Sequence, residues 1–336
     1  MAPLPLVSSP AKPSPVFSRL VPDRFILWLL ATVALAAAFP VSGAAARSVD
    51  MLTLAAIFAL FFLHGVRLPR EALIAGVTDW RLHLAILGLT FVAFPIIGLA
   101  LSLAFPGLLP LELWTGLLFL CALPSTVQSS IAYTSIAGGN VAGAVAAAAF
   151  SNLLGVFLTP AFAALLLEAQ GAEISLDGIG KIFALLFLPF LIGHAMRPLL
   201  LSFVAARPRL TTIVDKGTIL LAVYGAFSAA TVEGVWRRLP PADLAALTGL
   251  LLALLGLILA AAALLGRLGR FPAPSRAAIL FCGSVKSLAS GAPMARILFP
   301  GAAAGLVLLP VMIFHTLQLV VCAWIAGAMS RRDGGS

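Results

Sequence analysis

The longest uncharged stretch of the chain runs from Leu113 to Leu167, between Glu112 and Glu168. It holds fifty-five residues, whereas a single membrane crossing needs roughly 20 apolar residues. The stretch is therefore long enough for two helices, and Gly138-Gly139-Asn140 supplies the residues of a tight turn between them. The sequence predicts a helical hairpin that lies within a membrane.

A polar interruption lies in the first helix of this hairpin. Its residues are Pro124, Ser125, Thr126, Gln128, Ser129 and Ser130. Backbone left unpaired at membrane depth is tolerated only where protein or a water-filled cavity satisfies it, so broken helices usually line substrate or ion sites. The interruption is the first candidate binding site. The alternative is a proline kink whose hydroxyl groups bond back to their own helix.

The composition excludes a soluble protein. Of the 336 residues, 62% are hydrophobic and only 10% are charged, against about 25% charged in soluble domains. The net charge of +9 is dispersed over helix ends rather than gathered on a basic face, so nucleic acid is excluded as a partner. Cys121, Cys282 and Cys322 have no metal-ligand spacing, so no metal site and no cofactor are expected.

Ten apolar segments follow one another along the chain, so the expected fold is an all-α integral membrane protein with ten transmembrane helices. The expected crossings are 24–42, 49–66, 82–105, 113–137, 140–167, 180–200, 212–232, 243–266, 276–297 and 303–329. Residues 1–22 are expected to form a disordered cytoplasmic tail, residues 23–330 the ten-helix membrane domain, and residues 331–336 a C-terminal tail. The crossings divide into two repeats of five, 24–167 and 180–329, and an odd number makes the repeats inverted.

Lys and Arg in the loops predict the orientation. With the N-terminus inside, fifteen of them fall in cytoplasmic segments and five fall outside, so both termini are expected in the cytoplasm of a cell with a bacterial-type inner membrane. All twelve acidic residues lie in loops or at helix ends. The sequence therefore offers no carboxylate at mid-membrane for a cation site, or for an enzyme that works through paired carboxylates.

A second polar constellation lies in the ninth segment and includes Gly283, Ser284, Lys286 and Ser287. Lys286 is about 14 Å from either end of a helix that would span this segment, so it must face a cavity or a partner. A lysine at a helix centre costs on the order of 2.5–3.5 kcal/mol on insertion scales, which makes such residues functional by default. The alternative is a structural lysine whose ammonium group binds loose carbonyl groups.

Histidines and one glutamine complete the polar residues of interest. His315 and Gln318 share one face of the tenth segment at i, i+3 spacing, where they could form a site or a helix–helix hydrogen bond. His64 and His194 lie near cytoplasmic helix ends and are interpreted as interfacial.

The stretch from Pro124 to Pro160 resembles the fourth and fifth helices of the bile acid:sodium symporter family, and the ninth segment resembles a crossing helix of that family. The resemblance is greatest to the SBF-like branch, which includes the seventh human member of solute carrier 10. It implies ten helices in a core and a panel domain, with helices four and nine broken where they cross. It also implies sodium ligands at Ser129 and Ser130 and a hydroxyl ligand near Ser151, and it adds the neighbouring Asn152 to the candidate binding residues. The ninth helix departs from the family pattern, because it lacks the carboxylate and carries Lys286 where an amide is expected.

The resemblance implies a secondary transporter whose substrate is a small organic anion and whose surroundings are the lipid bilayer. Because like charges repel in a poorly solvated site, Lys286 is expected to replace sodium, either as a fixed cation or as a proton carrier. Two other functions stay open. One is a regulatory membrane protein that modulates calcium entry, and the other is a metalloid or anion exporter with a reactive cysteine. Protein partners cannot be deduced.

Overall fold

A computed structural model describes residues 24–67, 79–168, 183–299 and 301–333. The predicted N-terminal tail, the first residues of the sixth crossing at 180–182 and most of the C-terminal tail lie outside the described residues. Within the described ranges every regular element is a helix, which agrees with the predicted all-α class.

The described helices follow one another along the chain. They are α1 (Arg24–Ala38), α2 (Gly43–Arg67), α4 (Trp80–Gly88), the π-helix η2 (Leu89–Ala93), α5 (Phe94–Ala104), α6 (Leu111–Ala122), α7 (Val127–Ile136), α8 (Val141–Glu168), the π-helix η3 (Phe183–Phe187), α10 (Leu188–Ala195), α11 (Arg197–Ala205), α12 (Pro208–Val232), the 3₁₀-helix η4 (Val235–Arg238), α13 (Pro241–Leu268), α14 (Ala273–Ser284), α15 (Leu288–Leu298) and α16 (Ala303–Asp333). The chain turns at Gly138, which has φ = 64°, as the predicted hairpin requires.

Seven helical spans among the described residues are long and apolar enough to cross a membrane, and up to nine if each bent pair is counted as one span. The sequence predicts ten. The first predicted crossing contains α1, an apolar helix of only 15 residues. The sixth predicted crossing is not one straight helix, because the chain bends by 91° between Ala195 and Arg197. Pro198 follows directly and cannot donate the hydrogen bond that a continuous helix would need.

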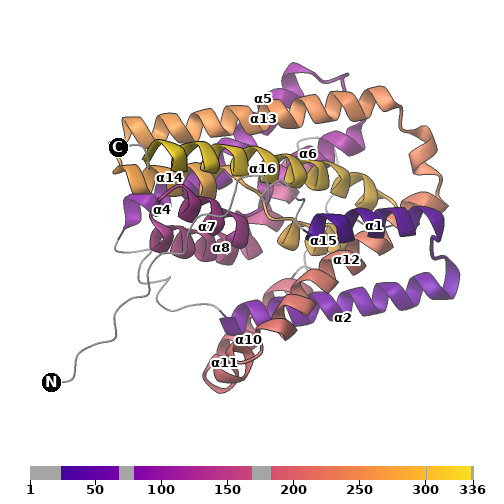
Figure 1. The fold of residues 1–336 in the computed structure, drawn as a ribbon. Coiled ribbons are helices and arrows are strands. Elements are labelled where there is room, and N and C mark those ends of the chain that lie inside the picture. Colours follow the sequence, from indigo (N-terminus) through magenta and orange to yellow (C-terminus); the bar gives the residue numbers. More distant parts are fainter. Residues whose placement is uncertain (1–23, 68–78, 169–182, 300, 334–336) are drawn as a thin grey trace.

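The helices form two groups that lie on different sides in Figure 1. The smaller group consists of α1, α2, α10, α11 and α12, and the larger group contains α4–α8 and α13–α16. Within the smaller group α2 and α10 cross very closely: a Cβ atom on Gly65 would lie 2.1 Å from the carbonyl oxygen of Phe190. A Cβ on Gly193 would lie 2.0 Å from the carbonyl oxygen of Phe62. The crossing therefore depends on both glycines.

The broken helices lie at the centre of the larger group. The span formed by α14 and α15 is largely covered by other helices: 89% of an apolar stretch of 18 residues within it is buried. α6 packs against α8 and α16, while α14 packs against α7 and α13. The polar interruptions are thus enclosed by protein rather than exposed to lipid, which is the condition for irregular backbone at membrane depth.

Candidate functional site

The first interruption separates α6 from α7. α6 ends at Ala122, Leu123 adopts an extended conformation (φ −70°, ψ 152°), and α7 begins at Val127 at an angle of 62° to α6. Pro124 explains the end of α6, because a proline disfavours the helical conformation of the preceding residue and supplies no backbone donor. The predicted broken helix is confirmed here.

The second interruption separates α14 from α15. α14 ends at Ser284, and Val285 is extended (φ −110°, ψ 152°). Ser287 is the N-cap of α15, because its Oγ accepts a hydrogen bond from the backbone N–H of Ser290 (3.2 Å). Lys286 thus lies in an extended linker between two short helices.

Three hydrogen bonds, in addition to those of the Lys286 side chain described below, join the two interruptions to each other. The N–H of Ser287 donates to the carbonyl of Pro124 (2.9 Å). The hydroxyl of Thr126 donates to the carbonyl of Lys286 (2.7 Å), and the hydroxyl of Ser125 donates to the carbonyl of Cys282 (2.6 Å). Serine and threonine at these positions therefore satisfy backbone groups of the partner helix, rather than only their own helix as in a simple kink.

Helix α8 supplies further partners to the same crossing. Asn152 donates to the carbonyl of Ser125 (2.8 Å) and accepts a hydrogen bond from the hydroxyl of Ser290 (3.1 Å). Ser151 accepts from the N–H of Ser125 (3.1 Å). Thr159, which the sequence analysis did not select, donates to the carbonyl of Ala122 (2.8 Å). Its place about two turns beyond Asn152 on the same apolar helix is the signal that could have found it.

The ammonium group of Lys286 is enclosed by backbone carbonyls. Its Nζ donates to the carbonyls of Thr90 (2.8 Å), Cys121 (2.8 Å) and Leu123 (2.7 Å), and the residue is 1% exposed. The Nζ also lies 4.1 Å from the ring centroid of Phe94, a cation–π contact. An ammonium group has three N–H donors. All three are used.

Five consecutive carbonyls at the end of α6 are consequently satisfied by other segments. Those of Cys121 and Leu123 accept from Lys286, that of Ala122 from Thr159, that of Pro124 from Ser287, and that of Ser125 from Asn152. Each carbonyl would otherwise be an unpaired acceptor in a buried site.

The side-chain amide of Gln318 in α16 forms hydrogen bonds with both backbone groups of Lys286, its N–H and its carbonyl. Its Oε1 accepts from the N–H of Lys286 (2.7 Å), and its Nε2 donates to the carbonyl of Lys286 (2.8 Å). The same Nε2 lies 3.0 Å from Nδ1 of His315. Because the amide nitrogen of Gln318 is a donor, Nδ1 of His315 is the acceptor. The proton of the neutral imidazole then resides on Nε2 of His315. The predicted pair is therefore joined, and it supports the second interruption.

A cavity of about 1730 Å³ lies between the two helix groups. Six of the predicted site residues line it: Thr126, Gln128, Ser129, Asn152, Ser287 and His315. The other eight lie behind its wall: Pro124, Ser125, Ser130, Ser151, Gly283, Ser284, Lys286 and Gln318. Within the described residues, the Oγ of Ser129 has no hydrogen-bond partner although it is buried.

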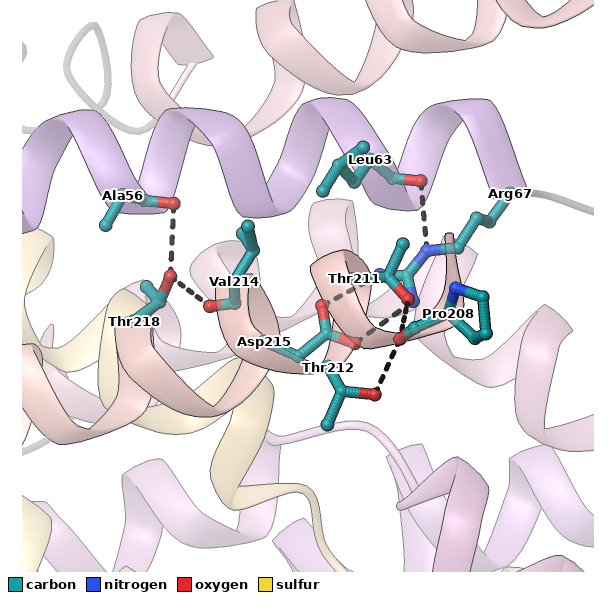
Figure 2. A network of polar contacts seen from close by, with 9 residues as sticks. All are labelled: Ala56, Leu63, Arg67, Pro208, Thr211, Thr212, Val214, Asp215 and Thr218. Atoms are coloured by element: carbon teal, nitrogen blue, oxygen red, sulfur yellow. Dashed lines mark hydrogen bonds and ion pairs between the residues drawn. The ribbon is translucent and has the colours of Figure 1, made fainter. Parts of the chain in front are cut away.

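The mouth of the cavity carries charged residues that the sequence analysis treated only as topology signals. Arg67, Lys216 and Arg331 line it together with Asp215. Arg67 and Asp215 form a bidentate ion pair (2.8 and 3.0 Å) that joins α2 to α12, as Figure 2 shows. His64, interpreted as interfacial, also lines the cavity. These residues escaped selection because nothing in the sequence says which helix ends meet around a common space.

Known proteins resemble this chain over most of its length. Residues 23–331 match the SBF-like CPA transporter family. The chain is 48% identical to the "Uncharacterized protein PA2026" of Pseudomonas aeruginosa, over 94% of this chain and 95% of that protein. It is 44% identical to the "Putative symporter YfeH" of Escherichia coli (92% and 93% covered) and 25% identical to the "Sodium/bile acid cotransporter 7-A" of Xenopus laevis (91% of each). The chain therefore belongs to the SBF-like CPA transporter family, and it is a multi-pass membrane transport protein rather than an enzyme.

Proposed function

We propose that this protein is a secondary transporter of a small organic anion, and that it works without a sodium ion at the helix crossing. The observation that carries the proposal is the three-carbonyl cage around the ammonium group of Lys286. A cation bound at the crossing would need oxygen ligands, and the five carbonyls of residues 121–125 already accept hydrogen bonds. Lys286 therefore takes the role of a permanently attached cation.

The hydrogen bonds favour a fixed cation over a proton carrier. A neutral amine has two N–H groups and could not donate to three carbonyls, whereas an ammonium group can. Loss of the proton would leave one buried carbonyl unpaired, which is unfavourable. We therefore expect Lys286 to keep its proton in this conformation.

The surface of the cavity supports an anionic solute. The N-terminus of α7 opens into the cavity at Thr126 and Val127, and the side chain of Thr126 does not cap it. A helix N-terminus carries a partial positive charge. Asp215, the acidic residue that lines the mouth, is paired with Arg67, so Lys216 and Arg331 give the mouth a positive balance.

The architecture that we propose for this function has ten membrane-spanning segments in two inverted repeats of five, 24–167 and 180–329, within a domain of residues 23–330. In this arrangement α1 and the bent pair of α10 and α11 each form one segment. Both termini lie in the cytoplasm of a bacterial-type cell, and the protein resides in its inner membrane. The large cavity then opens to the cytoplasm, because Arg67, Lys216 and Arg331 lie at cytoplasmic helix ends.

Transport into proteoliposomes tests this function. Purified protein is reconstituted, and a panel of labelled organic anions is supplied in sodium or in choline buffer at several pH values. We expect uptake of at least one anion at equal rates in the two buffers. A strong sodium requirement would contradict the role of Lys286, and absence of flux for every anion would favour a regulatory protein. A metalloid exporter finds no support, because all three cysteines are buried and do not line the cavity.

A further inference from the structure

Two cavities lie at opposite ends of the same three helices, α2, α12 and α15. The large cavity is bounded by the C-terminal end of α2 and the N-terminal ends of α12 and α15. A second pocket of about 240 Å³ lies at their other ends, lined among others by Asp50, Gly225, Glu233 and Arg296. Along α12, Ile219 lines the large cavity and Gly225, six positions further on, lines the second pocket, a rise of about 9 Å.

On each of these three helices, buried apolar residues lie between those that line the two cavities, and we call them the plug. The plug consists of Ile57, Ala222, Val223 and Ala295, which belong to one hydrophobic cluster. They come from the same three helices, so separating α15 from α2 and α12 would open this cluster.

Two ion pairs among the described residues differ in what they connect. Arg67 and Asp215 join α2 to α12 within the smaller group (Figure 2). Arg296 and Asp50 join α15 of the larger group to α2 of the smaller group. The first pair can persist when the groups move apart, whereas the second pair must break.

Arg296 is held tightly at this junction. Its side chain is 10% exposed, while that of Asp50 is 50% exposed. A Cβ atom on Gly225 of α12 would lie 3.4 Å from Nη2 of Arg296, so the guanidinium group rests against the backbone of α12 as well. One side chain of the larger group thus contacts two helices of the smaller group.

We propose that the pocket around Arg296 is the second entrance of the solute path, and that the ion pair of Arg296 with Asp50 closes it. The proposal rests on the transport function above. With the orientation proposed there, this entrance faces the outside. A half-exposed ion pair contributes only modestly to stability. It can therefore bias the balance between two conformations without locking one of them.

A cysteine placed in the plug reports whether this entrance is open. Ala222→Cys puts a thiol between the cavities, and a membrane-impermeant thiol reagent is added to intact cells. The chain without this substitution, whose three cysteines are buried, gives the background. We expect slow labelling of Ala222→Cys alone and labelling on the order of fivefold faster when Arg296→Gln or Asp50→Asn is added, the ratio that an ion pair of about 1 kcal/mol supports.

The matched control breaks the other ion pair. Arg67→Gln should leave the labelling rate unchanged, because that pair lies within one group. In the Ala222→Cys chain, Asp50→Arg or Arg296→Asp alone should give fast labelling. The two substitutions together exchange the charges of the pair and should restore slow labelling. Equal rates in Ala222→Cys with and without Arg296→Gln would overturn the proposal, as would an equal increase with Arg67→Gln. No solute is needed, so this result is independent of whether transport is detected.

Discussion

The charge on Lys286 is balanced by dipoles rather than by a carboxylate. Carbonyl oxygens from η2 and from the end of α6 converge on one ammonium group, and the ring of Phe94 covers it. Such an arrangement leaves a cluster of oxygen ligands when the side chain is removed. It also makes the role of the lysine accessible to a binding experiment that needs no knowledge of the solute.

We predict that Lys286→Ala acquires a response to sodium that the native protein lacks. Removal of the ammonium group frees three carbonyl oxygens, and oxygen ligands of this kind bind hard cations. The melting temperature of Lys286→Ala should therefore be higher in sodium chloride than in choline chloride. Sodium at about 100 times its dissociation constant would stabilise the variant by about 2.7 kcal/mol.

Lys216→Ala is the matched control for this prediction, because Lys216 lines the open mouth of the cavity and is not enclosed by carbonyls. It should melt at the same temperature in both salts. A sodium response in the native protein, or none in Lys286→Ala, would mean that the cage does not substitute for a cation site.

A second prediction concerns Ser129, whose buried hydroxyl has no partner within the described residues. Ser129→Leu should abolish transport, since it places a bulky apolar group on the cavity wall. It should cost little stability, because an unpaired hydroxyl contributes no hydrogen bond. Uptake in proteoliposomes and thermal unfolding in detergent measure the two effects.

Ser135→Leu serves as the comparison for Ser129→Leu, because Ser135 is exposed on the same helix and does not line the cavity. It should keep its transport activity. Full activity in Ser129→Leu would show that this wall does not contact the solute.

The sequence indicates the polar residues of the two interruptions because hydroxyls, amides and a lysine are rare at membrane depth. It does not indicate which of them face the cavity. Ser129 and Ser130 are neighbours, yet Ser129 lines the cavity while the hydroxyl of Ser130 donates to the carbonyl of Thr126. That difference depends on how α7 is rotated about its axis, which packing against α8, α14 and α16 determines.

At the scale of elements, the sequence predicts the end of α6 well because Pro124 acts locally. The predicted interruption extends to Ser130, whereas α7 already begins at Val127. The sequence misses the right-angled bend between α10 and α11, since apolar residues continue on both sides of Arg197 and Pro198. The close crossing of α2 and α10 is also invisible in the sequence. Its glycines look like any others until the two backbones are brought together.

We predict that Gly65→Ala strongly destabilises this crossing. The new methyl group would lie 2.1 Å from a backbone carbonyl of α10, which cannot move aside as a flexible side chain would. Thermal unfolding in detergent should show a large loss. Gly217→Ala is the control, because a Cβ there meets no atom within 4 Å, and alanine should gain about 0.5–1 kcal/mol over glycine in a helix. Equal stability of the two variants would mean that the α2–α10 crossing is looser than described.

At the scale of the whole molecule, composition is enough to predict a membrane protein, and hydropathy is enough to find the apolar segments. The grouping of these segments and the cavity between the groups depend on contacts between distant parts of the chain. α2 and α12 illustrate this, because Thr218 donates to the carbonyl of Ala56 across their interface (3.2 Å, Figure 2). No local pattern encodes such a pairing.

Topology reporters test the proposed orientation. A reporter fused after Ser336 should be active only in the cytoplasmic sense, because Lys and Arg are concentrated in the segments assigned to that side. A reporter inserted at Gly107, in the exposed connection between α5 and α6, should be active only outside. The reverse pattern would mean that the protein has the opposite orientation in the membrane. Activity on the same side at both positions would invalidate the proposed count of crossings.

The cation at the helix crossing is the ammonium group of Lys286, which is covalently part of the protein, and this has an energetic consequence. A sodium ion that binds on one side and leaves on the other transfers the work of its gradient to the solute, whereas a covalently attached ammonium group returns with the protein in every cycle. It can neutralise the crossing in both conformations, but it cannot be discharged down a gradient. Net accumulation of the solute would then require a second ion that enters the cavity with the solute, and without one the protein would only equilibrate the solute between the two sides.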